Sequence, residues 1–370
     1  MKYGGALPMQ HIHEMIRGEF LVDTKPENVR TGSLDLTPTS QFYRVSGAFL
    51  PSSDETVERA LKRVGADLLP PGAILERGAC YVCRLEERVD HLPGDVYGYA
   101  NPKSSSGRVD LHVRLLTDRV SRYDSIPNSY RGPLWLLIAP KTFAVAAPEG
   151  VPLNQVRFFT QDTRLDKLRL ELAFEQNGGL IARDDGSMIR HRDVGHSDED
   201  GSVILTLGLD FRIPGFEAIP TGLTLDLKKP KHYYDPREFF RPVTVSRDSL
   251  MLVSNTFYIL STREFVRVPV DYACEMAPMD ERSGEIRSHY AGYIDSGWGI
   301  GQDGNGRGRP LTLEVRSFDN RLIIRGGQPI AKIRYERVVE VPTEHYDSMS
   351  PNYGQQSGPQ LSKIFKPWEV

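Results

Sequence analysis

Short apolar runs separated by turn-forming residues dominate this chain. The runs are rich in leucine, isoleucine, valine and aromatic residues, and glycine, proline, aspartate or asparagine bounds most of them. This pattern is typical of β-strands joined by turns. We expect strands at Ala79–Leu85, Leu111–Leu116, Leu134–Ile138, Phe257–Leu260, Leu311–Val315 and Arg321–Arg325. The 26 prolines and 33 glycines fit a mainly β fold with many connections.

Helical spacing of apolar residues is found in only a few segments. His11–Arg17 predicts a short helix near the N-terminus. Asp54–Val64 predicts a second helix, for which Ser53 or Asp54 is the expected N-cap. Leu165–Phe174 fits either a helix or a strand near the end of the first half.

Several motifs of the first half return in the same order in the second half. The clearest pair is Gly132–Leu137 and Arg309–Glu314, which both contain a Pro-Leu-Xaa-Leu core. The other pairs are Thr31–Leu36 with Thr221–Leu227, Glu87–Asp95 with Glu264–Asp271, Lys103–Arg108 with Arg282–Arg287, and Pro152–Phe158 with Pro329–Tyr335. This order indicates two copies of one domain.

The length of 370 residues suits two such domains. The polar stretch Gln176–Gly201 indicates a linker or an exposed hairpin between them. We therefore place the boundary near residue 175 and expect domains at 1–175 and 176–370.

The repeated strand ends differently in the two copies. The first copy has Leu137 at this position, whereas the second has Glu314. Burying an unpaired carboxylate is costly or raises its pKa, so a chain that accepts this cost in one copy is expected to use the group. The alternative is a partly exposed strand residue that pairs with Arg316 or Arg325.

Composition and charge exclude several classes of protein. The chain is 39% hydrophobic and 26% charged with a net charge of −3, which gives no reason to expect nucleic-acid binding. It has no apolar run long enough to span a membrane and no signal-peptide pattern, so we expect a cytoplasmic protein. Cys80 and Cys83 have zinc-like spacing, but they lie in an apolar strand and no second pair follows, which favours core packing.

Polar motifs are concentrated in the second copy. Arg282, Ser283 and Gly284, followed by Arg287, offer guanidinium and hydroxyl groups that suit phosphate oxygens. The stretch Ala291–Trp298 places an acid in an apolar strand before a Ser-Gly turn and an aromatic residue. Further on, 352–359 is too polar and glycine-rich for a core element and is typical of a lid over a ligand.

In combination, these motifs resemble the dCTP deaminase family. The matching elements are Arg-Ser-Xaa-Xaa-Xaa-Arg, Ala-Gly-Xaa-Ile-Asp-Xaa-Gly-aromatic, Leu-Xaa-Leu-Glu and Tyr-Xaa-Xaa-Gln-Xaa-Gly-Pro. The resemblance is specific over about residues 220–363 and weaker over residues 1–160, as in the duplicated form of the deaminase. It implies two tandem domains of the trimeric dUTPase superfamily, each a distorted β-barrel or jelly roll, and assembly with threefold symmetry.

The resemblance also assigns roles to individual residues. Glu314 is implied to be the proton shuttle that activates water against C4 of cytosine, which agrees with the raised pKa expected of a buried carboxylate. The remaining implied roles are nucleotide contacts by Arg282, Ser283, Gly284 and Arg287, deoxyribose contacts by Asp295 and Trp298, backbone reading of the pyrimidine at Ala291, Thr312 and Leu313, and tail contacts by Tyr346, Tyr353 and Gln356.

The implied metal chemistry is simple. Mg²⁺ is expected to bind through the nucleotide triphosphate rather than in a protein cage. No zinc is expected, because the His-Xaa-Glu and Pro-Cys-Xaa-Xaa-Cys motifs of zinc deaminases are missing.

Departures from the family pattern leave alternatives open. Gly284 and Asn352 replace a serine and a lysine, and the glycine-rich stretch 299–308 resembles an insertion. In the first copy, 118–124 stands where Ala-Gly-Xaa-Ile-Asp is expected, which favours a structural domain. Its Ser104–Arg108 motif is nevertheless retained, and could complete a site in the second copy.

Three functions compete on this evidence. The leading hypothesis is hydrolytic deamination of dCTP to dUTP and ammonia. A dUTP diphosphatase, or a bifunctional enzyme that makes dUMP, would use Asp295 to orient water at the α-phosphate. A nucleotide-binding regulator without catalysis is the third possibility.

Overall fold

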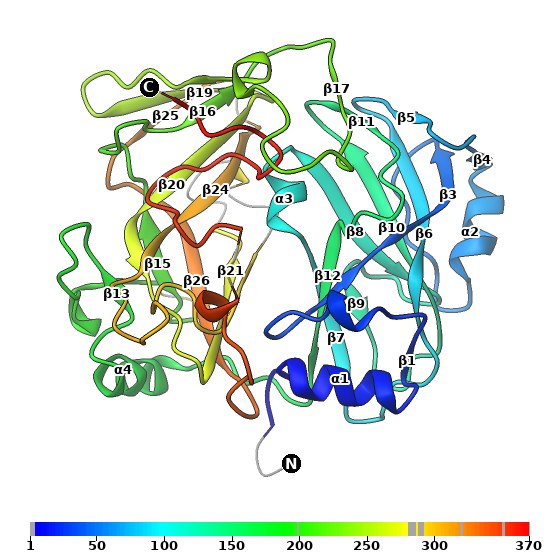
Figure 1. Ribbon diagram of the computed structural model, residues 1–370, viewed down its shortest axis with the longest axis horizontal. Coiled ribbons are helices and arrows are strands. Elements are labelled where there is room, and N and C mark those ends of the chain that lie inside the picture. The colour runs from blue at the N-terminus through cyan, green and yellow to red at the C-terminus, as the bar shows by residue number, and fades with distance from the viewer. Residues whose placement is uncertain are drawn as a thin grey trace. The chain divides into compact units, whose positions relative to one another are not determined.

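The chain is mainly β, as the apolar pattern predicted. The computed structural model describes residues 4–197, 200–279, 286–287, 292–318, 321–349 and 352–369. Strands make up 38% of it and helices 12% (Figure 1). All six predicted strands are present, and the predicted N-terminal helix is α1.

Two compact units divide the chain. Unit 1 comprises Met1–Asp162 and Thr221–Tyr233, and unit 2 comprises Thr163–Pro220 and Tyr234–Val370. Unit 1 contains α1 (Met9–Arg17), β1 (Leu21–Val22), η1 (Pro26–Asn28), β2 (Leu34–Leu36), β3 (Pro38–Val45), α2 (Val57–Arg63), β4 (Asp67–Leu68), β5 (Ile74–Leu75), β6 (Cys80–Val89), β7 (Tyr97–Pro102), α3 (Ser104–Gly107), β8 (Leu111–Thr117), β9 (Ser125–Ile126), β10 (Gly132–Pro140), β11 (Ala144–Ala146), β12 (Asn154–Phe159) and β17 (Thr224–Leu225).

Unit 2 repeats much of this order of elements. It contains α4 (Lys167–Gln176), β13 (Ile181–Ala182), η2 (His191–Asp193), β14 (Gly195–His196), β15 (Val203–Thr206), β16 (Phe216–Ala218), η3 (Pro236–Glu238), β18 (Phe240–Pro242), β19 (Ser249–Val253), β20 (Phe257–Val266), β21 (Tyr272–Ala277), β22 (Ile286–Arg287), β23 (Tyr293–Ile294), β24 (Arg309–Ser317), β25 (Arg321–Arg325), β26 (Pro329–Arg337) and η5 (Tyr346–Ser348).

The two units share one sheet topology. The larger sheet has the order β4-β3-β6-β10-β8 in unit 1 and β18-β16-β20-β24-β22 in unit 2, with β1 and β13 added to β6 and β20. The second sheet runs β2-β12-β7-β9 in unit 1, and β15-β26-β21-β23 follows the same order in unit 2. This correspondence confirms the internal duplication.

A glutamate–threonine contact fixes the alignment of the two copies. The Glu87 carboxylate accepts a hydrogen bond from the Thr37 N–H at 2.8 Å, and Glu264 accepts one from the Thr206 N–H at 2.7 Å. The counterpart of β2 is therefore β15. The predicted match of Thr31–Leu36 with Thr221–Leu227 is wrong, since β17 lies in unit 1 and pairs in parallel with β11.

The second copy begins with a helix, as the first does. Each of α1 and α4 precedes a two-residue strand that pairs with the long strand of the larger sheet. Asp166 caps α4 by accepting a hydrogen bond from the Arg169 N–H at 2.9 Å, and Leu170, Ala173 and Phe174 are buried. The expected boundary near residue 175 lies inside this helix, whereas the two units separate at Asp162.

The described residues of 176–201 are part of the folded domain and do not form a linker. Ile181 and Ala182 form the buried strand β13, which pairs with β20. A bridge between Ala182 and Met188 closes a hairpin, and only its tip near Asp185 is exposed. The hairpin alternative was therefore correct at the tip, while the base of the hairpin belongs to the core because its apolar residues pair with a central strand.

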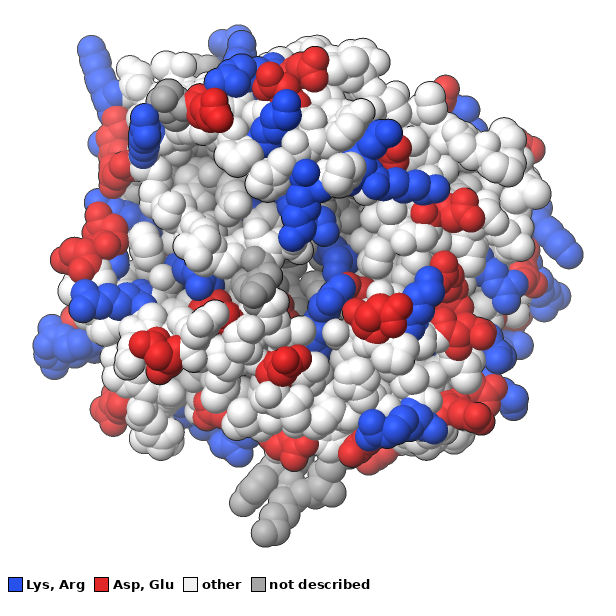
Figure 2. All heavy atoms as spheres, viewed as in Figure 1, with Lys and Arg blue, Asp and Glu red and all other residues white. Residues whose placement is uncertain are grey.

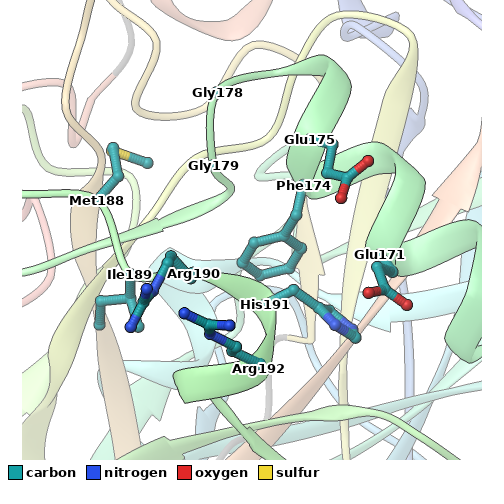
Figure 3. Close-up of a pocket in the computed structure, with 10 residues that line it drawn as sticks. All are labelled: Glu171, Phe174, Glu175, Gly178, Gly179, Met188, Ile189, Arg190, His191 and Arg192. Atoms are coloured by element: carbon teal, nitrogen blue, oxygen red, sulfur yellow. The ribbon is translucent and has the colours of Figure 1, made fainter.

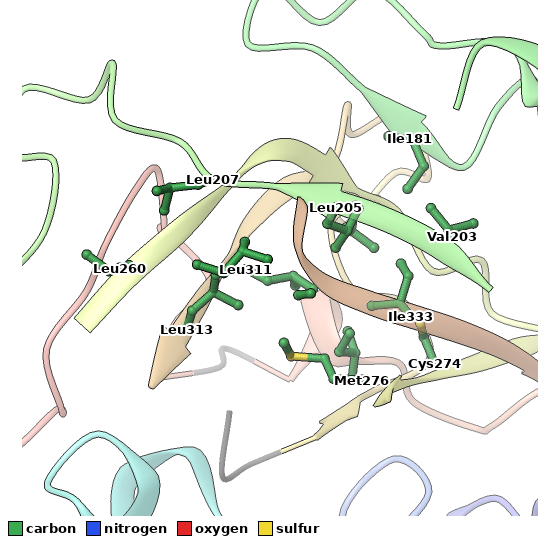
Figure 4. Close-up of a cluster of buried hydrophobic side chains, with 14 of the residues drawn as sticks. Ile181, Val203, Leu205, Leu207, Leu260, Cys274, Met276, Leu311, Leu313 and Ile333 are labelled. Carbon is green, nitrogen blue, oxygen red and sulfur yellow. The ribbon is translucent and has the colours of Figure 1, made fainter. Parts of the chain in front are cut away.

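The core of unit 2 lies between its two sheets. Leu260, Leu311 and Leu313 come from the larger sheet, and Leu205 and Ile333 from the second sheet (Figure 4). In unit 1, Cys83 is fully buried on β6, and burial raises the pKa of its thiol far above the ordinary value. Cys83 is thus a core residue.

Candidate functional site

Strand β24 has one apolar face and one polar face. Leu311, Leu313 and Val315 enter the core cluster of unit 2. Because side chains alternate along a strand, Thr312 and Glu314 lie on the opposite face, together with Arg316. We call this opposite face the site face. Glu314 is only 2% exposed, so its carboxylate is removed from bulk water. Leu313 offers only its backbone to a ligand, since its side chain is in the core.

The strand register places Leu137 and Glu314 at equivalent positions. Leu137 lies opposite Val82 on β6, and Glu314 lies opposite Ile259 on β20. The two registers agree when Pro133 of β10 is matched with Pro310 of β24, and this alignment sets Leu137 at the position of Glu314. The carboxylate is therefore a true difference between two copies of one strand.

In unit 1 the equivalent face is filled by a helix. Leu137 and Trp135 belong to an apolar cluster that also contains Val57 and Leu61 of α2. Thr56 caps this helix, and not the predicted Ser53 or Asp54, because its hydroxyl accepts the Arg59 N–H at 3.3 Å. The position of Leu137 is thus closed by packing.

Two guanidinium groups start from the site face. Arg287 on β22 lies directly opposite Arg316 on β24, two residues beyond Glu314. Opposite residues and residues two apart share a face, so both cations extend from the face that carries the carboxylate. The Arg316 guanidinium donates a hydrogen bond to the Asn255 carbonyl. The predicted contacts Arg282, Ser283, Gly284 and Ala291 lie outside the described residues.

The turn after β23 orders Asp295 and Trp298. The Trp298 N–H donates to the Asp295 carbonyl at 3.2 Å, and Asp295 itself is half-buried. Gly297 has φ +86°, and a Cβ there would lie 2.5 Å from the Cβ of His345, so the turn requires glycine. Trp298 is buried in the core cluster, where the centres of its ring and of the Tyr346 ring are 5.0 Å apart.

The first copy has no acid at the position of Asp295. Ile126 pairs with Gly98, and Ile294 pairs with Cys274, which aligns β9 with β23. The residue that follows is Pro127 in unit 1 and Asp295 in unit 2. The predicted match of 118–124 with the Ala-Gly-Xaa-Ile-Asp motif therefore lies too early in the chain. The reason is that the connection before β9 is longer than the sequence motif indicated.

The C-terminal segment lies over one end of β24. The Gln356 side-chain amide donates to the Pro310 carbonyl at 2.6 Å. The Gln360 N–H donates to the Thr312 hydroxyl at 3.3 Å, which places the tail on the site face. The Tyr353 hydroxyl accepts the Lys363 N–H at 3.3 Å and fixes the intervening turn. Two of the predicted tail residues, Tyr353 and Gln356, are thus buried parts of one tail that covers β24.

Sequence reasoning missed an ion pair that supports this site. The buried Asp347 carboxylate contacts the Arg309 guanidinium at 2.5 Å and accepts the Gly301 N–H at 2.7 Å. The same guanidinium lies 5.6 Å from the ring centre of Trp298. Asp347 thereby joins the start of β24, the glycine-rich loop and η5. The sequence signal that could have identified Asp347 is its position next to Tyr346, a predicted site residue.

A separate cavity of about 510 Å³ lies at the end of α4 (Figure 3). Phe174 and His191 both line it, and their rings meet edge to face with their centres 5.3 Å apart. Burial lowers the pKa of His191. Arg190, which also lines the cavity, pairs with Asp193 at 2.7 Å. None of the lining residues is one of the predicted site residues.

Three further observations concern ligand classes. Charges of both signs are interspersed over the face shown in Figure 2. Across the described parts of the chain, no three His, Cys, Asp or Glu side chains are grouped so as to hold a metal ion. None of the helices in the described ranges has the length and apolar character needed to cross a membrane.

Comparisons with known proteins agree for both halves of the chain. Residues 3–162 match the 2′-deoxycytidine 5′-triphosphate deaminase N-terminal domain, and residues 182–365 match its C-terminal domain. The crystal structure of 2′-deoxycytidine 5′-triphosphate deaminase from Agrobacterium tumefaciens is 33% identical in sequence, with a TM-score of 0.80. The match covers 92% of this chain and 99% of that chain. A search of curated proteins found no match.

Proposed function

Because the chain belongs to the dCTP deaminase family, we propose that it hydrolyses dCTP to dUTP and ammonia with Glu314 as the acid–base group. The observation that carries this proposal is the buried Glu314 on β24, where the other copy has the packed Leu137. A carboxylate that is held out of bulk water on a face open to a ligand suits general acid–base catalysis.

In the proposed reaction Glu314 accepts a proton from water as the oxygen attacks C4 of cytosine. The carboxyl gives this proton to N3 of the ring, and then moves the proton of the new C4 hydroxyl to the amino nitrogen. The C4–N bond breaks, ammonia leaves, and the C4 oxygen becomes the carbonyl oxygen of dUTP. The water supplies the new carbonyl oxygen, so one dCTP and one water give one dUTP and one ammonia. No redox partner is needed.

The other predicted residues would hold the nucleotide. The Arg287 guanidinium starts from the site face, where it suits a phosphate oxygen. Asp295 and the buried Trp298 lie in one turn, which supports their proposed place at the deoxyribose. Mg²⁺ would enter with the triphosphate, whose oxygens are the hard ligands that this ion prefers.

Ammonia release from dCTP in the presence of Mg²⁺ tests the proposal. Wild-type protein should release ammonia, and Glu314→Gln should lose at least about a thousandfold in rate, the order expected for a group in acid–base catalysis. Glu217→Gln is the matched control, because Glu217 lies on β16 of the same sheet and pairs with the exposed Arg241. An inert wild-type protein, or a fully active Glu314→Gln variant, would refute the proposal.

Product analysis separates the alternatives. Pyrophosphate release together with dUMP would indicate the bifunctional enzyme, in which Asp295 orients water at the α-phosphate. Binding of dCTP without either product would indicate the regulator. EDTA should slow the reaction if the triphosphate is recognised as its Mg²⁺ complex.

A further inference from the structure

The cavity at the end of α4 has an apolar inner part and a charged rim. Phe174, which lines it, is 3% exposed, and Met188 and Ile189, which also line it, are half-buried. The charged lining residues are exposed, namely Glu171, Glu175, Arg190 and Arg192. We call this cavity the α4 cavity. Its volume of about 510 Å³ lies in the range of small-molecule sites, which is about 300–1,000 Å³.

The first copy of the domain differs at a position that lines this cavity. In unit 1 the Phe20 N–H donates to the Met15 carbonyl at 2.9 Å just after α1. The same bond after α4 runs from the Gly179 N–H to the Phe174 carbonyl at 2.7 Å, so Phe20 is the counterpart of Gly179. A Cβ at Gly179 would lie 2.6 Å from the Met188 side chain, and its φ of +108° also favours glycine. The second copy thus has only backbone in the cavity wall where the first copy has an aromatic ring.

Opposite charges lie on two sides of the α4 cavity (Figure 3). Glu171 and Glu175, which are one helical turn apart, lie on one side of the Phe174 ring. The guanidinium groups of Arg190 and Arg192 lie on the other side. Among the residues that the structure describes, neither glutamate takes part in an ion pair, and Arg192 has none either. These three charges are therefore available to a ligand.

We propose that the α4 cavity binds a nucleotide whose base carries an amino group, with that group at Glu171 and Glu175 and the phosphate at Arg192. Carboxylates accept hydrogen bonds from an amino group, and a guanidinium binds phosphate oxygens in pairs. The base would pack against the Phe174 ring. Burial lowers the pKa of His191, so its ring is neutral at pH 7 and adds no charge to this arrangement. An α-amino acid fits less well, because its amino and acid groups share one carbon and do not lie at opposite ends of a ring.

Occupancy of the α4 cavity is linked to the glycine-rich loop that precedes β24. The Arg267 guanidinium donates to the Gly179 carbonyl in the cavity wall at 3.0 Å and to the Gly304 carbonyl in the loop at 3.4 Å. The loop in turn contacts the Asp347 carboxylate through the Gly301 N–H at 2.7 Å. A nucleotide that restrains Gly179 therefore also restrains this loop. None of these residues belongs to the site face, so the proposal goes beyond the proposed function.

Isothermal titration calorimetry with AMP and with IMP tests the site, because IMP has a carbonyl oxygen in place of the adenine amino group. Wild-type protein should bind one AMP per chain, and it should bind IMP at least about tenfold more weakly. Glu171→Gln/Glu175→Gln and Arg192→Gln should each weaken AMP binding at least about tenfold. These side chains are exposed, so the variants should fold. Arg183→Gln is the matched control and should bind AMP as wild type does, because Arg183 is exposed on the same hairpin and does not line the cavity.

Amide hydrogen exchange tests the link to the glycine-rich loop. The Gly301 and Gly308 N–H groups are hydrogen-bonded in the folded loop and exchange when it opens. AMP should slow their exchange at least about threefold in the wild-type protein and leave it unchanged in the Glu171→Gln/Glu175→Gln variant.

Four results would overturn the proposal. Wild-type protein could bind AMP more weakly than about 1 mM, or it could bind IMP as tightly as AMP. AMP binding could survive the substitutions in the cavity, or AMP could leave the loop amides unprotected. Neither measurement depends on deaminase activity, so a failure of this proposal is distinct from a failure of the proposed function.

Discussion

Replacing Glu87 by glutamine is expected to remove a pH-dependent loss of stability in unit 1. Glu87 lies on β6 and is 2% exposed. Its carboxylate accepts hydrogen bonds from the Thr37 N–H at 2.8 Å and from the Asn28 amide at 3.4 Å. Burial raises the pKa of Glu87 from 4.5 to about 7, and the hydrogen bonds with Thr37 only partly oppose this rise.

The sign of the effect follows from the raised pKa. The folded state holds the Glu87 proton between pH 4.5 and about 7, while the unfolded state has released it. The stability that this proton contributes is complete below pH 4.5 and is lost as the pH rises through 7. A tenfold change in proton affinity is worth about 1.4 kcal/mol, so the full loss is about 3 kcal/mol. Glutamine keeps an acceptor oxygen for Thr37 and does not titrate.

Tryptophan fluorescence allows this loss to be measured in unit 1. Trp135 lies in unit 1, so urea unfolding of a Trp298→Phe/Trp368→Phe background follows that unit. Between about pH 5 and about pH 8, the free energy of unfolding of unit 1 should fall by about 2–3 kcal/mol more in the protein with Glu87 than in the Glu87→Gln variant. Glu86→Gln, which removes a charge from the neighbouring position, should behave like the protein with both glutamates. Equal pH dependence with and without Glu87 would refute the reasoning.

Three further predictions concern β24 and its counterpart. Leu137→Glu should destabilise unit 1 by about 3 kcal/mol or more without adding deaminase activity, whereas Leu137→Met should cost about 1 kcal/mol or less; equal melting temperatures would contradict this. Asp347→Asn should cost about 3 kcal/mol, measured by urea unfolding, because it leaves the largely buried Arg309 guanidinium uncompensated. Gln356→Ala should raise the KM for dCTP about tenfold, since the Pro310 carbonyl loses its donor and about 1–2 kcal/mol of tail docking with it; an unchanged KM would argue against a tail that closes on the nucleotide.

The sequence alone determined the local structure and the candidate catalytic group. Apolar runs with turn residues at both ends identified the strands that became β6, β8, β10, β20, β24 and β25. The repeat of the Pro-Leu-Xaa-Leu strand aligned Leu137 with Glu314, and the register of both larger sheets keeps that alignment. These features are local, because alternation along a strand and the contrast between a leucine and a carboxylate can both be recognised from a few consecutive residues.

Only the tertiary structure decided which segments pair over long distances. Thr221–Leu227 resembles the segment before β3, yet it adds a strand to unit 1, and the true counterpart of β2 is marked by the contact of Glu264 with Thr206. Asp347 and Gln360 lie in the C-terminal part of the chain, and each contacts β24 through one hydrogen bond. No local sequence pattern predicts these contacts. A short polar segment can pair with several partners, and the choice depends on which edge and which buried donor the rest of the fold leaves open.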